Sequence, residues 1–108
     1  MNGGTNPIKV RRGRTERVTV YLPYSVAGDE VTSEMRAGLH RGAKLIATWD
    51  VVIDEEDGRK IYLTLDDSDT SGIVETTGYM DLKRVTGGEP VQILENPLLV
   101  LISDPITA

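Results

Sequence analysis

The fold of this chain of 108 residues is decided by residues 78–94, which read GYMDLKRVTGGEPVQIL. Apolar and polar residues alternate through the first half of this stretch, as is typical of a strand with one buried face. Gly87-Gly88 then supplies a tight turn, and Pro90 to Leu94 returns as a second strand. We therefore expect a β-hairpin that closes an all-β domain.

The strongest strand pattern in the rest of the chain runs from Lys44 to Asp54. Its alternate apolar residues share one face, which we expect to point inward: Leu45, Ala47, Trp49, Val51 and Ile53. A period of two over this length argues strongly against a helix. Asp57-Gly58 is a hairpin turn signal, after which residues 59–65 return as a partner strand. The inward residues of that partner are Ile61, Leu63 and Leu65.

Shorter segments complete the pattern. We expect an edge strand at 8–11, further strands at 16–22 and 31–37, and a last strand after Pro97. In the strand at 31–37 the predicted inward residues are Val31, Met35 and Ala37. Residues 66–75 predict a single helical turn or a compact loop.

About seven short strands at this spacing indicate a sandwich or a small barrel. Because the strands fall into hairpins joined by longer crossings, the sandwich is favoured. We predict an immunoglobulin-like β-sandwich over residues 16–108, preceded by an extended basic N-terminal arm over residues 1–15.

The composition excludes several kinds of site. The chain has no Cys and one His, so disulfides, thiolate metal sites and multi-histidine sites are excluded. Residues 67–72 match the first half of a calcium loop, but Gly78 stands where that loop requires a bidentate Glu. The four carboxylates of residues 54–57 suit a solvated turn, and His40 lacks a nucleophile in a recognisable motif. We predict no catalytic residue, no cofactor and no metal.

The charge is distributed unevenly. Residues 1–17 hold five basic residues and one acidic residue, a net charge of +4, whereas residues 18–108 hold seven basic and sixteen acidic residues, a net charge of −9. One interpretation is a solvated tail beside an ordinary acidic surface. The other is an arm that docks on an acidic neighbour, such as another copy of the chain. In that case the partner-binding residues are Lys9, Arg11, Arg12, Arg14 and Arg17. We do not expect nucleic acid as a partner, because the body is acidic and the arm lacks aromatic residues. No apolar run is long enough to span a membrane.

From residue 31 onward the sequence resembles the immunoglobulin-like β-sandwich modules of tail, baseplate and tail-fibre proteins in tailed bacteriophages. The resemblance is carried by SEMR (33–36) before AKLIAT (43–48), GRKIYLTL (58–65) before DTS (69–71), and GYMDL (78–82), GGEPV (87–91), LLVLI (98–102) and DPIT (104–107). It covers about two-thirds of the chain, and its motifs are short strand and turn segments.

The resemblance implies a non-enzymatic structural protein of a tailed-phage virion, made in the bacterial host cytoplasm. Such a protein assembles on the tail, baseplate or fibre apparatus, with other virion proteins as partners and several copies in the assembly. Two alternatives remain open. One is a capsid decoration protein that an N-terminal arm fastens to the capsid lattice. The other is a sandwich that binds a carbohydrate or the host surface, whose signature is a patch of exposed aromatic residues.

Overall fold

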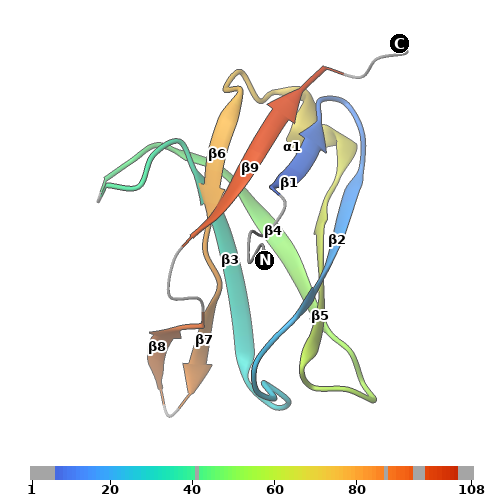
Figure 1. The fold of residues 1–108 in the computed structure, drawn as a ribbon, viewed down its shortest axis with the longest axis vertical. Coiled ribbons are helices and arrows are strands. Elements are labelled where there is room, and N and C mark those ends of the chain that lie inside the picture. Colours follow the sequence, from blue (N-terminus) through green and yellow to red (C-terminus); the bar gives the residue numbers. More distant parts are fainter. Residues whose placement is uncertain (1–6, 41, 87, 94–96, 105–108) are drawn as a thin grey trace, which may run out of the picture.

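A computed structural model describes residues 7–40, 42–86, 88–93 and 97–104 of the chain. These residues form β-strands and one short helix (Figure 1), so the predicted all-β class is confirmed. The strands are β1 (Ile8–Arg11), β2 (Glu16–Tyr21), β3 (Glu30–Arg36), β4 (Leu45–Ile53), β5 (Lys60–Leu65), β6 (Thr77–Met80), β7 (Lys83–Thr86), β8 (Glu89–Gln92) and β9 (Leu98–Ser103). The helix, α1 (Asp67–Ser71), is the predicted helical turn.

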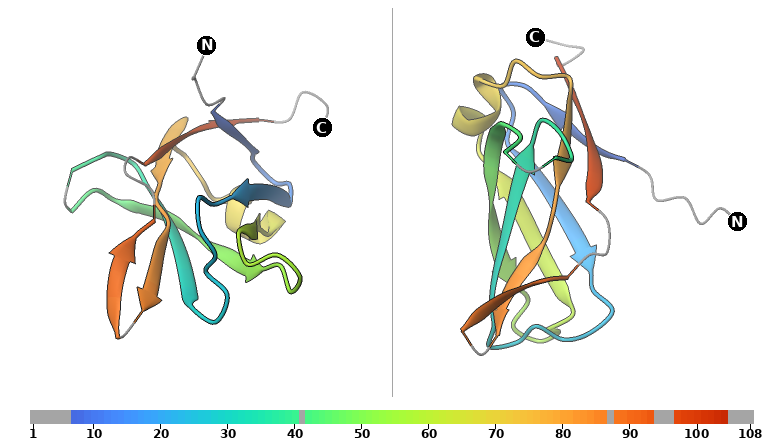
Figure 2. Two further views of the ribbon diagram at one scale, coloured as in Figure 1. Left: turned by 60° about the horizontal axis from the view of Figure 1, so that its bottom comes forward. Right: turned by 90° about the vertical axis from the view of Figure 1, so that its left-hand side faces the viewer.

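The strands belong to one sheet, in the order β1-β9-β6-β3-β4-β5-β2, with β7 pairing to both β3 and β8. Strand β4 changes partner halfway along its length: residues 45–49 pair with β3, and residues 50–53 pair with β5. The two end strands, β1 and β2, come to lie against each other (Figure 2). The sheet is thus nearly closed into a barrel, the alternative that the strand spacing left open, and the immunoglobulin-like sandwich is not confirmed.

The core lies inside this curved sheet. Trp49 is 2% exposed, so its predicted inward orientation is confirmed. The predicted inward residues of β5 are also confirmed, because Ile61, Leu63 and Leu65 are fully buried. Val18 and Val20 of β2 and Leu98 of β9 pack against this cluster and are partly buried.

Two predicted inward residues, Ala37 and Leu45, are exposed instead. Ala37 lies just after the end of β3 at Arg36, in the loop to β4, so the alternation of the strand no longer applies to it. Leu45 is exposed because the register shifts: Met35 faces Ala47 across the β3–β4 ladder, whereas the next residue, Arg36, faces Leu45. One residue of β4 is skipped there, so the alternation of faces is interrupted. Ile46 packs against the core at this irregularity.

The predicted single strand over residues 78–86 is divided into β6 and β7. Asp81 and Leu82 separate them, and both short strands pair with β3. The Ser33 hydroxyl donates a hydrogen bond to the backbone oxygen of Asp81 (2.7 Å), and Leu82 is fully buried. β7 and β8 pair as the predicted hairpin, and Gly88 has a positive φ of 84° that favours glycine; Gly87, the other residue of the predicted turn, lies outside the described residues.

The predicted edge strand at 8–11 is confirmed as β1, which runs parallel to β9. Val10 is fully buried, so β1 contributes to the core. Residues 7–15, which we assigned to the arm, therefore lie along the body of the domain. Residues 1–6 of the predicted arm lie outside the described residues.

Candidate functional site

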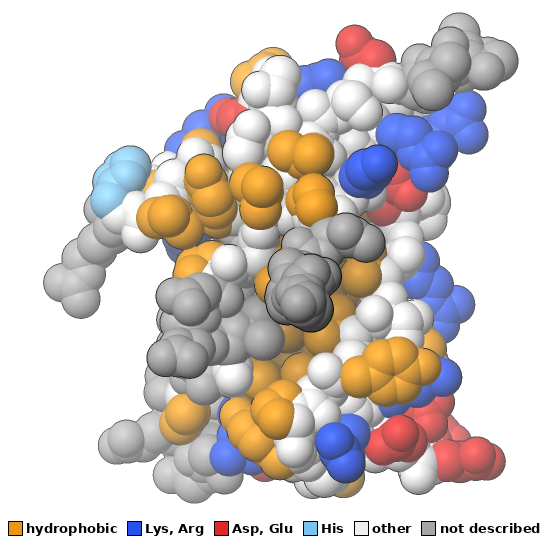
Figure 3. Space-filling view, viewed as in Figure 1, with side chains coloured by type: hydrophobic (Ala, Val, Ile, Leu, Met, Phe, Trp, Pro, Cys, Tyr) orange, Lys and Arg blue, Asp and Glu red, His pale blue; other side chains and the backbone are white. Residues whose placement is uncertain are grey.

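The outer surface of β9 and its neighbours carries exposed apolar side chains. Leu99 and Leu101 are each 39% exposed. Tyr79 of β6 faces Leu99, and Lys9 of β1 faces Leu101, in the two flanking ladders. We call Lys9, Tyr79, Leu99 and Leu101 the β9 face. Figure 3 shows apolar side chains gathered over β6 and β9, with Lys and Arg side chains beside them.

The β9 face was not predicted, although the sequence holds a signal for it. Alternation places Leu98, Val100 and Ile102 inward, which leaves Leu99 and Leu101 pointing out. Exposed leucines on adjacent outward positions are unusual in a strand that faces only water. The face is therefore a candidate interaction surface.

Lys9 and Arg11 are the predicted partner-binding residues that lie at this surface. Both point outward from β1, and Lys9 forms no ion pair or hydrogen bond with the described residues. Arg11 lies 3.3 Å from Glu16, which also accepts a hydrogen bond from the Arg11 backbone nitrogen (2.7 Å). The Arg11 side chain is still 54% exposed, so its charge remains accessible beside the apolar residues.

Arg12 lies differently from these two residues. Its guanidinium donates to the backbone oxygens of Ile73 (Nε, 2.7 Å) and Glu75 (Nη2, 2.6 Å), and it lies 3.1 Å from Asp104. The side chain is 20% exposed. Arg12 fastens β1 to the segment between α1 and β6. The alternation of β1 indicates this position, because Arg12 has the same parity as the buried Val10.

The last two predicted residues lie apart from the β9 face. The Arg17 guanidinium on β2 stacks over the ring of Tyr62 on β5, 4.6 Å from its centroid. Arg14 follows β1, and its backbone oxygen accepts a hydrogen bond from the Thr70 hydroxyl (2.7 Å). The five predicted cations therefore do not form one cluster.

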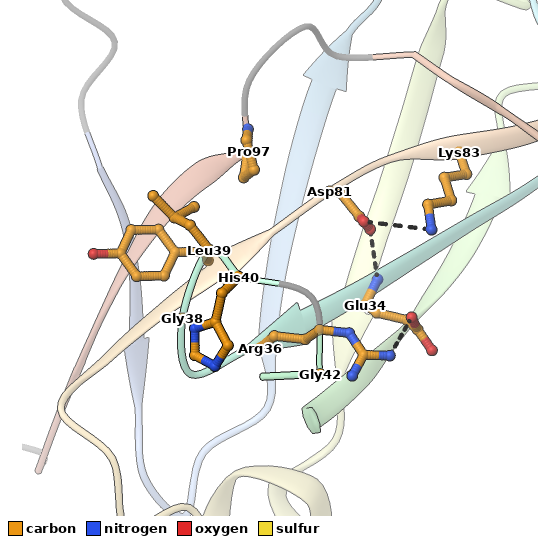
Figure 4. Close-up of a pocket in the computed structure, with 10 residues that line it drawn as sticks. Glu34, Arg36, Gly38, Leu39, His40, Gly42, Asp81, Lys83 and Pro97 are labelled. Atoms are coloured by element: carbon orange, nitrogen blue, oxygen red, sulfur yellow. Dashed lines mark hydrogen bonds and ion pairs between the residues drawn. The ribbon is translucent and has the colours of Figure 1, made fainter. Parts of the chain in front are cut away.

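A cleft of about 500 Å³ opens beside the β3–β4 loop. Its charged side chains are drawn in Figure 4 and are paired with one another: Arg36 with Glu34 at 3.0 Å, and Lys83 with Asp81 at 3.8 Å. His40 also lines the cleft and is exposed. Paired charges on a solvent-exposed surface offer little driving force for acid–base chemistry.

The turn between β4 and β5 carries the four consecutive carboxylates, residues 54–57. The Asp54 carboxylate accepts hydrogen bonds from the Tyr62 hydroxyl (2.7 Å) and from the backbone nitrogens of Glu56 and Asp57. The Tyr62 hydrogen bond is the main reason that the pKa of Asp54 lies below its ordinary value. Asp54 is therefore a structural part of the turn, whereas Glu55 and Glu56 have exposed side chains.

A shallow hollow of about 430 Å³ lies on the same turn. It is lined by Val52, Ile53, Asp54, Glu55, Glu56 and Tyr62. Val52 is 61% exposed, so the hollow combines carboxylates with accessible apolar surface. We call these residues the acidic hollow.

The calcium-like pattern of residues 67–72 forms the helix α1 and its C-terminal cap. Asp66 and Asp69 form a reciprocal capping box, and the Ser71 hydroxyl donates to the backbone oxygen of Asp67 (2.6 Å). These interactions explain the clustered polar residues as helix capping. Within residues 7–40, 42–86, 88–93 and 97–104, no group of three or more His, Cys, Asp or Glu side chains could hold a metal ion.

Comparison with models of known protein families and with curated proteins finds no match to the sequence. In the part of the chain that the structure describes, no helix is long and apolar enough to cross a bilayer.

Proposed function

We propose that this protein is a non-enzymatic structural protein of a tailed-phage virion that assembles on the tail, baseplate or fibre apparatus. The observation that carries an assembly role is the β9 face, where Leu99 and Leu101 are exposed beside the accessible charges of Lys9 and Arg11. An apolar surface bordered by polar residues is typical of protein interfaces. The relationship to immunoglobulin-like phage modules is part of this proposal and comes from the sequence resemblance.

A binding role fits the described surface better than a catalytic one. The charged groups of the cleft beside β3 neutralise one another, and its one histidine is exposed to solvent. Among the described residues, no ion pair neutralises Lys9, the one charged side chain of the β9 face. Binding through surface complementarity needs only such a face and a rigid sheet behind it.

The test is to purify the virions of the phage that encodes this protein and to look for the chain by mass spectrometry. The chain should be present with the tail or baseplate proteins. A Leu99→Ser/Leu101→Ser variant should fold with an unchanged circular dichroism spectrum but should not be incorporated. Val74→Ser is the matched control, because Val74 is 76% exposed and lies outside the β9 face. Absence of the chain from purified virions would refute the proposal.

Separating purified virions into tails and capsids distinguishes the proposed tail protein from the first alternative, a capsid decoration protein. A capsid decoration protein, fastened by its N-terminal arm, would be recovered with tailless capsids instead of with tails. Its loss would destabilise capsids and leave tails intact. Recovery with capsids alone would therefore favour that alternative.

Binding of a carbohydrate or host surface is favoured by one observation, the 70% exposure of Tyr21 on β2. Aromatic faces stack on sugar rings, and Lys60, the partner of Tyr21 in the β2–β5 ladder, has its ammonium 5.8 Å from the centre of the Tyr21 ring. The neighbouring Tyr62 supports this reading less, because both Arg17 and Lys60 lie over its ring, at 4.6 Å and 5.4 Å from its centre. Specific retention of the protein by purified host cell wall, lost in Tyr21→Ala, would favour this alternative.

A further inference from the structure

We propose that the β9 face of one copy docks on the acidic hollow of a second copy, so that the chain assembles head to tail. This inference rests on the proposed assembly role and adds the partner and the two surfaces that meet. The partner that covers the β9 face is therefore a second copy of this chain. The two surfaces would bind through apolar contacts and through attraction between opposite charges.

The first surface is basic and apolar. Lys9 lies directly across the β1–β9 ladder from Leu101, and its side chain is exposed without a described partner. Arg11, one outward position further along β1, is half exposed. A docked partner would therefore meet leucine side chains with cations along one border.

The second surface has the complementary composition. The acidic hollow is lined by the exposed side chain of Val52 and by three carboxylates, and the cations Arg17 and Lys60 lie over the ring of Tyr62, which also lines it. Glu55 and Glu56 are exposed, and no described residue pairs with their carboxylates. A leucine of β9 can contact Val52 while Lys9, on the neighbouring strand β1, reaches Glu55 or Glu56. Opposite potentials of this kind steer encounter and fix the register of two surfaces.

The two surfaces lie at different ends of the molecule. In Figure 1 the β4–β5 turn is at the lower right, whereas β1 and β9 lie in the upper half of the view. Figure 3 shows the same separation, with carboxylates gathered at the lower right and cations at the upper right. A contact between unlike patches is heterologous, and it produces a ring if the rotation closes or a filament if it does not.

Each contact is small, because four residues on one side meet six on the other. Interfaces that bury less than about 1,200 Å² in total are typically weak. We therefore expect a weak, reversible association of the isolated protein that strengthens when several contacts form in one assembly. We also expect strong salt dependence, since the screening length falls from about 10 Å at 0.1 M to about 3 Å at 1 M ionic strength.

The experiment is sedimentation velocity of the wild-type protein over a concentration series, at low salt and at 1 M salt (the higher ionic strength considered above). Association should rise with concentration at low salt and should fall at high salt. Lys9→Glu should weaken it at least about tenfold, and so should Glu55→Lys/Glu56→Lys, because each places like charges opposite each other. Glu30→Lys is the control: Glu30 is exposed on β3 and belongs to neither surface.

Mixing the two charge-reversed variants supplies the decisive comparison. Each variant keeps one original surface, and the mixture restores opposite charges at the contact, so it should associate although neither variant does alone. A wild-type protein that stays monomeric at every concentration would overturn the inference. So would a dimer that is indifferent to Glu55→Lys/Glu56→Lys. Neither outcome bears on the presence of the chain in virions, so failure here is distinguishable from failure of the proposed function.

Discussion

Replacing Arg12 by Ala should destabilise the protein far more than removing any exposed cation of the same segment. The guanidinium donates short hydrogen bonds to the backbone oxygens of Ile73 and Glu75. Hydrogen bonds that involve a charged group contribute about 1.5–3 kcal/mol each. The ion pair with Asp104 contributes about 0–1 kcal/mol, because Asp104 is 80% exposed. Allowing for partial solvation of the site, we expect a loss of about 3 kcal/mol in the free energy of unfolding.

Thermal unfolding followed by circular dichroism measures this loss. In a domain of this size about 1 kcal/mol shifts the midpoint by about 4–8 °C, so a loss of about 3 kcal/mol in Arg12→Ala should lower it by about 12–24 °C. Lys9→Ala removes the same charge from an exposed position, where substitutions change the stability by about 0.5 kcal/mol or less, so the midpoint should move by at most about 2–4 °C. Arg12→Lys should fall between them, because one ammonium replaces a planar fork of donors. Equal midpoints for Arg12→Ala and Lys9→Ala would refute the reasoning.

Three further predictions concern the core and the acidic turn. Gly78→Ala should cost about 1–3 kcal/mol in urea unfolding, because the added Cβ would lie 2.9 Å from Met35 Cγ. Tyr62→Phe should raise the pKa of Asp54 in an NMR titration, because it removes the main hydrogen bond that lowers it. Trp49 fluorescence should be blue-shifted in the folded state and poorly quenched by iodide, because the side chain is 2% exposed.

Each of these three predictions has a result that contradicts it. Gly72→Ala is the control for Gly78→Ala, since an added Cβ at Gly72 meets nothing within 4 Å. Equal losses in the free energy of unfolding for the two variants would contradict crowding at Gly78. For Tyr62→Phe, a lowered pKa of Asp54 stabilises the fold above its ordinary pKa, and this contribution disappears as the pH falls through the folded-state pKa. The stability difference from wild type should therefore shrink toward acid pH, and a difference that grows there contradicts the assignment. Efficient iodide quenching would place Trp49 at the surface.

The β4–β5 hairpin was predictable because its signals are local. Alternation fixes which residues face inward, and Asp57-Gly58 marks the turn. The exposure of Leu45 was not predictable, since it follows from a skipped residue in the pairing with β3. The closure of the sheet depends on how β4 divides its length between two partners. Such a choice is decided by tertiary packing, and no local pattern encodes it.

The candidate site was predicted only in part. The basic segment was found from charge, but charge alone does not separate the exposed Lys9 from the half-buried Arg12. Alternation along β1 distinguishes these two residues, because Arg12 has the same parity as the buried Val10 and Lys9 has the opposite parity. This argument can be used only once residues 8–11 are known to form a strand of the sheet. The apolar half of the β9 face became visible only when Leu99 and Leu101 were seen to lack a covering element among the described residues.

The parallel pairing of β1 with β9 also sets the order in which the domain is completed. Ile8 pairs with Val100, so nearly the whole chain separates the two strands of this ladder. Closing so long a loop is entropically costly, and contacts between distant residues slow folding. The pairings of β3 with β4, of β4 with β5 and of β2 with β5 need no residue of β9, so we expect them to form before β9 is available during synthesis. Because β9 is the ladder partner of β1, we expect β1 to complete its pairing, and Val10 to become buried, only after β9 has been synthesised.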